Sequence, residues 1–391
     1  MEELRSETDM VQYLGKELVS CMKCHLCNTV CPVCDPRVSQ GPYGMNRSIY
    51  YALKWESFND HLRDIVYSCS TCGKCVEKCK AVSRALPLIE IIETARELLL
   101  VEKMQGPMPE QTGVLKNMHV RGNPWGYPSH ERTQWVQDLD IPLASEASDL
   151  DVFYFVGCAC SYDPQAQKIA KNLSKILKAA KVRFGISKEE VCSGSEARRM
   201  GEPGLFQYLS EINANIFEQT GNRPIITADP HSYYTFTREY PGKDRLEAYH
   251  YTQFLNTLLD KEQLKLSSRV EKRVTYHDPC YLGRHGGVFD EPRRLIERVP
   301  GIVLVEMEHH HEESDCCGMG GGRMWMEPPE GFLSSQMISK RRVEQAIATG
   351  SEILLTACPF CNISLSDAVK DLGKEDDLKV MDITELICMA L

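Results

Sequence analysis

The chain carries 18 cysteines among 391 residues, and most of them stand in tight groups with regular spacing. The two groups nearest the N-terminus share the pattern C-x-x-C-x-x-C-x-x-x-C: Cys21, Cys24, Cys27 and Cys31, then Cys69, Cys72, Cys75 and Cys79. With this spacing, three cysteines of a group hold one [4Fe–4S] cubane and the fourth crosses to the other cubane. The predicted ligands are Cys21, Cys24, Cys27 and Cys79 for cluster 1, and Cys31, Cys69, Cys72 and Cys75 for cluster 2. Zinc is the alternative metal, although zinc sites rarely space four cysteines so evenly.

A third group of thiols lies in the last third of the chain: Cys280, the adjacent pair Cys316 and Cys317, and then Cys358 and Cys361. Each stands at the end of an apolar run or in a glycine-rich loop beside one. Adjacent cysteines can place two thiolates on neighbouring metal ions. The glycines of segment 318–322 allow close backbone approach and can direct N–H groups toward an anion, as a buried cluster requires. The group predicts cluster 3, with five buried metal-free thiols as the alternative.

This third group resembles the cysteine-rich CCG domain of the heterodisulfide reductase catalytic subunit. The resemblance implies a non-cubane [4Fe–4S] cluster held by all five thiols. The first two groups resemble the helical two-cluster ferredoxin domain of heterodisulfide reductase and succinate dehydrogenase iron–sulfur subunits. Over nearly its whole length the chain resembles the fused ferredoxin plus cysteine-rich iron–sulfur oxidoreductase subunits. Its segment 276–285 looks closest to the flavoprotein-associated relatives, and the chain as a whole looks closest to these or to the relatives of benzoyl-CoA reductase complexes.

Composition is that of an ordinary globular protein, with 42% hydrophobic and 26% charged residues, and the length suits two or three domains. A net charge of −10 without a long basic run argues against a nucleic-acid partner. The chain opens without a charged-then-apolar signal sequence, and no apolar run approaches the ~20 residues of a membrane helix. We therefore expect a cytoplasmic protein without a membrane span of its own, with thiols that bind metal rather than pair as disulfides.

The expected fold class is α+β / α/β, in which a helical two-cluster ferredoxin-like domain precedes two Rossmann-like cysteine-rich repeats. The expected boundaries are 1–104 for the ferredoxin domain, 105–148 for a connector, 149–265 for the first repeat and 266–391 for the second. In both repeats, strand-like apolar runs alternate with segments of helical periodicity, which favours parallel sheets covered by helices. The runs are 152–156, 225–227, 302–305 and 353–355. Glycine and proline at both ends of 106–128 are expected to break any helix or strand in the connector.

The first repeat is a degenerate copy of the second. Ser193, Asp229 and Ser232 stand where the second repeat has cysteines. We favour a repeat without metal, whose thiols are buried as small hydrophobic groups. A mixed zinc or iron site is the alternative, and its candidate ligands are Cys158, Cys160, Cys192, Asp229 and His231.

Two functions fit these features. The first is an electron-transfer subunit of a larger anaerobic redox complex, which would need a flavoprotein subunit or an electron-transfer flavoprotein as partner. This follows because no nucleotide or flavin fingerprint is present in the sequence. The partner could also hold the chain at the inner face of a membrane. The second function is an enzyme that reduces a disulfide or thiol substrate at cluster 3, with Cys317 and His277 as candidate catalytic residues. Whether the chain is itself an enzyme is left open.

Overall fold

The computed structural model describes residues 5–21, 24–34, 41–79, 85–136, 139–147, 149–242, 244, 246–328 and 333–391. The chain divides into two compact units. Unit 1 consists of Met1–Lys116, Gly194–Gln207 and Asp315–Ser339, and unit 2 of Asn117–Ser193, Tyr208–Ser314 and Lys340–Leu391. Each unit therefore gathers segments that are far apart in the sequence, and neither is a single stretch of chain.

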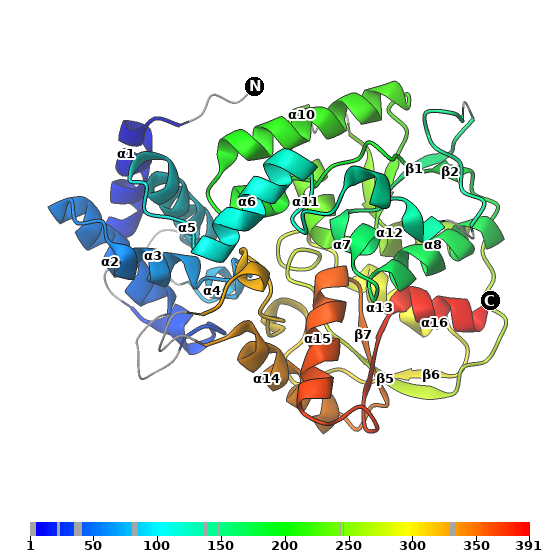
Figure 1. Ribbon diagram of the computed structural model, residues 1–391. Helices are drawn as coiled ribbons and strands as arrows, with labels where there is room; N and C mark the ends of the chain where they lie inside the picture. The colour runs from blue at the N-terminus through cyan, green and yellow to red at the C-terminus, as the bar shows by residue number, and fades with distance from the viewer. Residues whose placement is uncertain are drawn as a thin grey trace. The chain divides into compact units, whose positions relative to one another are not determined.

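Unit 1 is helical around the first two cysteine groups, as expected for a ferredoxin-like domain. Its helices are α1 (Glu7–Val19), α2 (Pro42–Trp55), α3 (Asp60–Tyr67), α4 (Lys74–Glu77), α5 (Leu88–Glu97) and α9 (Ser195–Arg199). The side chain of Ser6 caps α1, and Asn59 caps α3, because each accepts a backbone N–H of the first turn. Helix α5 continues into a π-helical turn at Leu98–Glu102. Figure 1 shows α1 to α4 in blue and α5 in teal.

The expectation that the connector contains no helix is wrong. Helix α6 spans Pro109–Arg121 in this stretch. The proline and glycine residues at its ends delimit this helix instead of preventing it. Pro109 stands at the first helical position, where its missing N–H costs nothing. Gly122 directly after the last turn has φ +68, a left-handed conformation that ends helices. Trp135, further along the connector, is buried with 4% exposure.

Unit 2 contains two four-stranded sheets in which every pairing is parallel. The first has the order β2-β1-β3-β4, from Phe184–Gly185, Val152–Phe155, Ile225–Thr227 and Ala248–His250. The second has the order β6-β5-β7-β8, from Ile302–Leu304, Lys272–Tyr276, Ile353–Thr356 and Lys379–Asp382. Both sheets place their strands in the same sequence order, second-first-third-fourth. This shared topology confirms two α/β repeats of one kind.

Helices connect the strands of both sheets, as parallel pairing requires. The first repeat contains α7 (Cys158–Tyr162), α8 (Gln167–Ala179), α10 (Pro203–Gln219), α11 (Pro230–Arg238) and α12 (Tyr251–Asp260). The second contains α13 (Asp290–Glu297), α14 (Ser335–Ala348), α15 (Pro359–Asp371) and α16 (Ile383–Ala390). The apolar face of α8 is fully buried at Ile169, Leu173 and Ile176. Among the described residues, no helix is both long and apolar enough to cross a bilayer.

Candidate metal centres

The first thiol set in unit 1 surrounds Cys27, which lies on the 3-10 turn Leu26–Thr29. The pKa of Cys27 is raised to about 11, first by burial and then by the neighbouring thiols of Cys21, Cys24 and Cys79. Burial also raises the pKa of Cys21, and Cys79 and Cys24 add to this rise. A hydrogen bond from Asn46 Nδ2 to Cys21 Sγ, over 3.0 Å, lowers the pKa in part. Cys79 thus lies with the first cysteine group, although it belongs to the second group in sequence.

The second thiol set surrounds Cys75 on α4. Burial raises the pKa of Cys75 well above its usual value, and the neighbouring thiols of Cys69, Cys31 and Cys72 contribute to the rise. The pKa of Cys31 is raised in the same way, by burial first and then by Cys69 and Cys72. Thiols that raise one another's pKa lie close together, as the ligands of one metal site do. Without metal such thiols keep their protons, and a bound metal ion takes the place of these protons.

Backbone N–H groups face several of these sulfurs. The N–H of Thr71 donates to Cys69 Sγ over 3.4 Å, and the N–H of Leu86 donates to Cys79 Sγ over 3.3 Å. In the third group, the N–H of Gly318 donates to Cys316 Sγ over 3.2 Å. Such donors stabilise negative charge on sulfur, which a thiolate ligand carries.

The glycine-rich loop lies against the backbone of the second cysteine group within unit 1. A Cβ on Gly321 would meet the Cys69 carbonyl oxygen at 2.5 Å, and a Cβ on Gly320 would meet the Ser70 carbonyl oxygen at 2.6 Å. The predicted close backbone approach is therefore present. Gly321 also adopts φ +65, which disfavours any side chain there.

Arg96 of α5 fixes this arrangement from inside the unit. Its guanidinium is fully buried and donates to the carbonyl oxygens of Val66 at 2.9 Å and of Cys69 at 2.6 Å. It also donates to the carbonyl oxygens of Arg199 at 2.7 Å and Gly321 at 2.9 Å. One side chain thus joins the segment before the second cysteine group to two distant segments of the chain. Its role was not visible in the sequence, because its partners are up to 225 residues away.

In unit 2, residues of the third group follow neighbouring strands. His277 and Cys280 follow β5, and Cys358 and Cys361 follow β7, which pairs with β5 in parallel. The carboxyl ends of parallel strands meet at one edge of the sheet, where ligands of open α/β sheets usually bind. Cys358 is the N-terminal cap residue of α15, and Cys361 lies in the first turn of this helix. Cys280, Cys358 and Cys361 are all buried.

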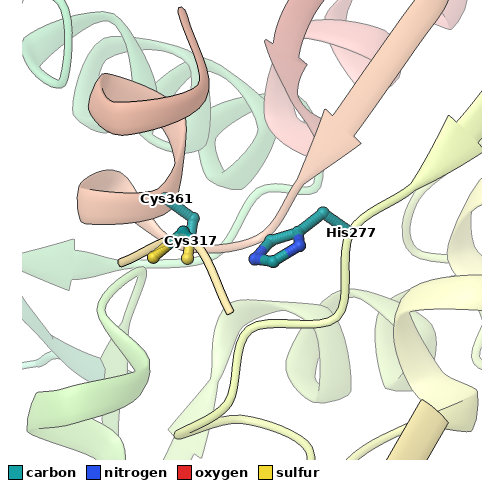
Figure 2. A group of neighbouring side chains, drawn as sticks. All are labelled: His277, Cys317 and Cys361. Carbon is teal, nitrogen blue, oxygen red and sulfur yellow. The ribbon is translucent and has the colours of Figure 1, made fainter. Parts of the chain in front are cut away.

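His277, Cys317 and Cys361 each offer one ligand atom, and these atoms lie within 4.8 Å of one another. Figure 2 shows the imidazole with one ring nitrogen turned toward the two sulfur atoms. Within the described part of the chain, this is the one such group of three or more histidine, cysteine or acidic side chains. Cys280, Cys316 and Cys358, also predicted as ligands, are buried but do not belong to the group of three.

Arg342 of α14 orients the ring of His277. Its Nε donates to His277 Nδ1 over 3.1 Å. The guanidinium is fully buried and also donates to the His309 carbonyl oxygen at 2.9 Å and to Ser314 Oγ at 3.0 Å. Because an arginine can only donate, Nδ1 of His277 accepts, and the neutral ring carries its hydrogen on Nε2. A nitrogen that bears hydrogen can donate to sulfur but cannot ligate a metal, so the geometry favours His277 as a donor.

An ion pair fixes the loop after β5. Arg293 donates to both carboxylate oxygens of Asp278, at 2.7 and 3.0 Å, and its Nε contacts Glu306 at 2.6 Å. Burial alone would raise the pKa of Asp278, but the hydrogen bonds and charge of Arg293 hold it below its usual value. Asp278 is thus ionised and holds the chain between His277 and Cys280 in one position.

The first repeat uses two of its candidate ligands for other purposes. The carboxylate of Asp229 caps α11 and accepts the N–H groups of His231 and Ser232, both at 3.1 Å. The ring of His231 stacks on Tyr281 at a centroid distance of 4.1 Å. Cys158, Cys160 and Cys192 are buried. The vestigial ligand set named from the sequence is therefore not gathered around one point in the described residues.

Family models agree with this division of the chain. A cysteine-rich domain (CCG) matches residues 152–237 and 274–366, one match on each sheet of unit 2. A 4Fe-4S dicluster domain matches residues 17–82. A crystal structure of a hypothetical protein from Helicobacter pylori superimposes with a TM-score of 0.62 over 100% of this chain and 73% of that one, at 10% sequence identity. This likeness concerns the fold alone.

Among curated proteins, the chain is 32% identical to a subunit of the dihydromethanophenazine:CoB–CoM heterodisulfide reductase of Methanosarcina barkeri, over 96% of this chain and 94% of the relative. It is 36% identical to the probable iron–sulfur-binding oxidoreductase FadF of Bacillus subtilis and 34% identical to the EtfAB:quinone oxidoreductase of Syntrophomonas wolfei. These matches cover 83% and 84% of the chain but only 46% and 47% of the relatives, so the chain spans about half of their length. With its ferredoxin segment and its two cysteine-rich repeats, the chain belongs to the family of iron–sulfur oxidoreductase subunits that includes FadF and this heterodisulfide reductase component.

Proposed function

We propose that this protein is an electron-transfer subunit that passes single electrons between two [4Fe–4S] cubanes and a third cluster of the CCG, non-cubane type. The observation that carries the proposal is that one thiol of each ferredoxin group lies near thiols of the other group. Cys79 lies with the first group, and Cys31 lies with the second. When bound, such clusters exchange electrons one at a time.

The proposed ligands of the cubanes are the two sets named from the sequence. Cluster 1 is held by Cys21, Cys24, Cys27 and Cys79, and cluster 2 by Cys31, Cys69, Cys72 and Cys75. The buried or half-buried state of most of these thiols supports this assignment, with Cys24 the exposed exception. The N–H donors from Thr71 and Leu86 support it too, since they compensate negative charge on thiolate sulfur.

The proposed ligands of cluster 3 are Cys280, Cys316, Cys317, Cys358 and Cys361. The N–H that Gly318 donates to Cys316 supports a thiolate there. The short distances among His277, Cys317 and Cys361 support a common site. In this proposal His277 directs its Nε2–H at a sulfur of the site and holds a proton near it.

We also propose a flavoprotein as the partner in a multi-subunit anaerobic complex. A relay of single electrons needs a partner that collects or delivers electron pairs, and a flavin does this. The relative named EtfAB:quinone oxidoreductase supports the assignment, and the chain spans about half of its length. Cytoplasmic location, with membrane contact only through a partner, belongs to the same proposal.

A second candidate function is reduction of a disulfide or thiol substrate at cluster 3, with Cys317 and His277 in the reaction. The near-complete match to the Methanosarcina heterodisulfide reductase component favours it, because 94% of that relative is covered. In this alternative the chain would take part in catalysis and would not be only a relay.

Iron analysis tests the cluster content. Three clusters require about twelve iron atoms per chain with matching sulfide in anaerobically prepared protein. About eight iron atoms would remove the third cluster from the proposal, and stoichiometric zinc in place of iron would contradict all three.

Replacement of Cys317 by Ser separates the two functions. In this variant we expect the spectroscopic signal of cluster 3 to be lost, while both cubanes can still be reduced. Electrons should then not pass onward from the cubanes. Cys34→Ser is the control, because Cys34 lies outside the proposed ligand sets. Turnover of a low-molecular-weight disulfide by the isolated wild-type protein, and not by the variant, would favour the enzyme over the relay.

A further inference from the structure

The first repeat of unit 2 contains a thiol pair beside a buried guanidinium. Cys158 begins α7 directly after Gly157, and Cys192 lies in the segment before α9. Arg132 Nη2 donates to Cys158 Sγ over 3.3 Å, and the Cys192 side chain also hydrogen-bonds Cys158. Arg132 is only 2% exposed. None of these residues belongs to the cluster ligands proposed above.

The position of Arg132 is fixed independently of Cys158. Its Nη1 contacts Glu190 Oε1 at 2.8 Å, and its guanidinium lies over the Tyr162 ring, 5.2 Å from the centroid. Glu190 is held in turn, because it accepts the N–H groups of Val156 at 3.1 Å and Gly157 at 2.9 Å. These contacts hold the cation beside the Cys158 sulfur before any reaction, as stabilisation of a thiolate requires.

Cys160 provides a comparison within the same helix. Burial would raise the pKa of Cys158, yet the hydrogen bonds from Cys192 and Arg132 and the charge of Arg132 bring it below its usual value. For Cys160, burial raises the pKa well above the usual value, and Asp229 and Asp382 add to the rise. Cys158 is 8% and Cys192 6% exposed, against 1% for Cys160. All three cysteines are buried, and Cys160 is the most deeply buried of them.

We propose that Cys158 and Cys192 form a redox-active dithiol that exchanges with a low-molecular-weight disulfide, RSSR. The Cys158 thiolate attacks one sulfur of RSSR, the S–S bond breaks, and RS⁻ leaves and takes a proton from water. Cys192 then loses its proton and attacks Cys158 Sγ in the mixed disulfide, releasing a second thiolate, which is protonated to RSH. RSSR gains two electrons and becomes two RSH, and the pair loses two electrons and becomes a disulfide.

This dithiol stands where the second repeat has thiols of cluster 3. In the sequence, Cys192 and Ser193 match Cys316 and Cys317. Asp229 and His231 are engaged in the cap of α11 and in stacking on Tyr281. Ser193, Asp229 and Ser232 stand where the second repeat has cysteines, so two thiols suit two-electron thiol chemistry better than binding of a five-thiol cluster.

The test treats anaerobic, iron-loaded protein with excess oxidised glutathione, alkylates the remaining thiols, and maps disulfide-linked peptides without reduction. We expect a Cys158–Cys192 linked peptide while the iron content stays unchanged. Cys192→Ser should stop at a glutathione adduct on Cys158. Cys160→Ser is the matched control and should react like wild type.

Alkylation of the wild-type protein provides a measurement that needs no variant. Cys158 should react with iodoacetamide at least about tenfold faster than Cys160, since reactivity follows the thiolate fraction. The double variant R132Q/E190Q, which removes both buried charges together, should abolish this difference.

Equal rates at Cys158 and Cys160 in the wild-type protein would overturn the proposal. So would the absence of both the glutathione adduct and the linked peptide. Loss of iron on oxidation, or in Cys158→Ser, would do the same, because these thiols would then be cluster ligands. The cluster proposal would survive the first two outcomes.

Discussion

At the scale of single residues, the role of His277 depends on which nitrogen of its ring carries hydrogen. Short distances to Cys317 and Cys361 alone would make the imidazole a metal-ligand candidate. The hydrogen bond from Arg342 to Nδ1 assigns it a different role, because Nε2 then bears the hydrogen. The arginine is a positioning residue, and it acts on the site only through the ring.

Replacement of His277 by Gln tests this role. Gln retains an N–H donor without a ring nitrogen of ligand strength, so we expect unchanged iron content and a modest shift of the third spectroscopic signal. Cys361→Ser is the control that should lose this signal. Loss of iron in His277→Gln would show that the imidazole is a ligand after all.

Nuclear magnetic resonance of ¹⁵N-histidine-labelled metal-free protein tests the arginine. The wild-type ring should show the Nε2–H tautomer, and Arg342→Met should produce a mixture of tautomers. A wild-type ring with hydrogen on Nδ1 would contradict the assignment.

The crossed thiol sets permit a second residue-scale prediction. Cys79→Ser and Cys24→Ser should remove the same cubane, and Cys31→Ser and Cys72→Ser should remove the other. Electron paramagnetic resonance of the four reduced variants would show this as two matching pairs of residual spectra. An uncrossed arrangement would instead pair Cys79→Ser with Cys72→Ser.

At the scale of elements, the cap of α16 links β8 to the helix through a buried acid. Asp382 accepts the N–H of Thr384 at 2.9 Å and the hydroxyl of Tyr251 at 3.0 Å, and it is fully buried. Its pKa is raised to about 7, because burial outweighs the hydrogen bonds from Thr384 and Tyr251, which lower the pKa. The cap is therefore largely protonated in the folded protein at mildly acidic pH.

This cap should give unit 2 a specific pH dependence. An unfolded aspartate ionises near pH 4, so between pH 4 and about 7 the folded state binds more protons than the unfolded state. The contribution of Asp382 to stability is therefore present at low pH and is lost as pH rises through this window, by up to about 1.4 kcal/mol per pH unit. Asp382→Asn keeps the cap acceptor and should remove this slope.

Anaerobic urea unfolding at several pH values measures the effect as the difference between variant and wild type. Asp377→Asn is the control, since Asp377 forms an exposed ion pair with Lys374 and should leave the slope unchanged. Parallel pH profiles for wild type and Asp382→Asn would show that Asp382 is already ionised in the folded state.

At the scale of the whole molecule, the ferredoxin segment is not a separable module. Unit 1 includes Gly194–Gln207 and Asp315–Ser339 as well as the N-terminal residues. The buried Arg96 depends on both, through the carbonyl oxygens of Arg199 and Gly321. An isolated buried cation that loses such partners costs several kcal/mol.

A fragment of residues 1–104 should therefore fail to retain two stable cubanes. Its iron content after anaerobic reconstitution and gel filtration should fall well below eight atoms, the number two cubanes require. The same fragment with Arg96→Met, which removes the buried charge, should recover part of the loss. Full retention by the unaltered fragment would show that the ferredoxin segment folds without the two distant segments.

Local patterns are sufficient to predict much of this molecule. The cysteine spacing indicates the ferredoxin segment, and apolar runs such as 152–156 and 353–355 predict two parallel sheets. Other features depend on contacts without a local pattern. Arg342 meets His277 across 65 residues, and Arg132 meets Cys158 across 26 residues. Helix α6 is not predicted because Pro109 and Gly122 resemble breakers, although each suits one end of a helix.

The contact between Arg96 and Gly321 also affects when the second cysteine group can acquire its cluster. These residues are separated by 225 positions, and a ribosome adding roughly 5 to 20 residues per second needs about 10 to 45 s to cover that interval. During this delay the nascent N-terminal helices exist without one acceptor for a guanidinium that is buried in the finished protein. Iron delivery to the second cysteine group before release of the chain would thus act on an incomplete pocket. Stable insertion of the cluster at the second cysteine group should accordingly follow completion of the chain.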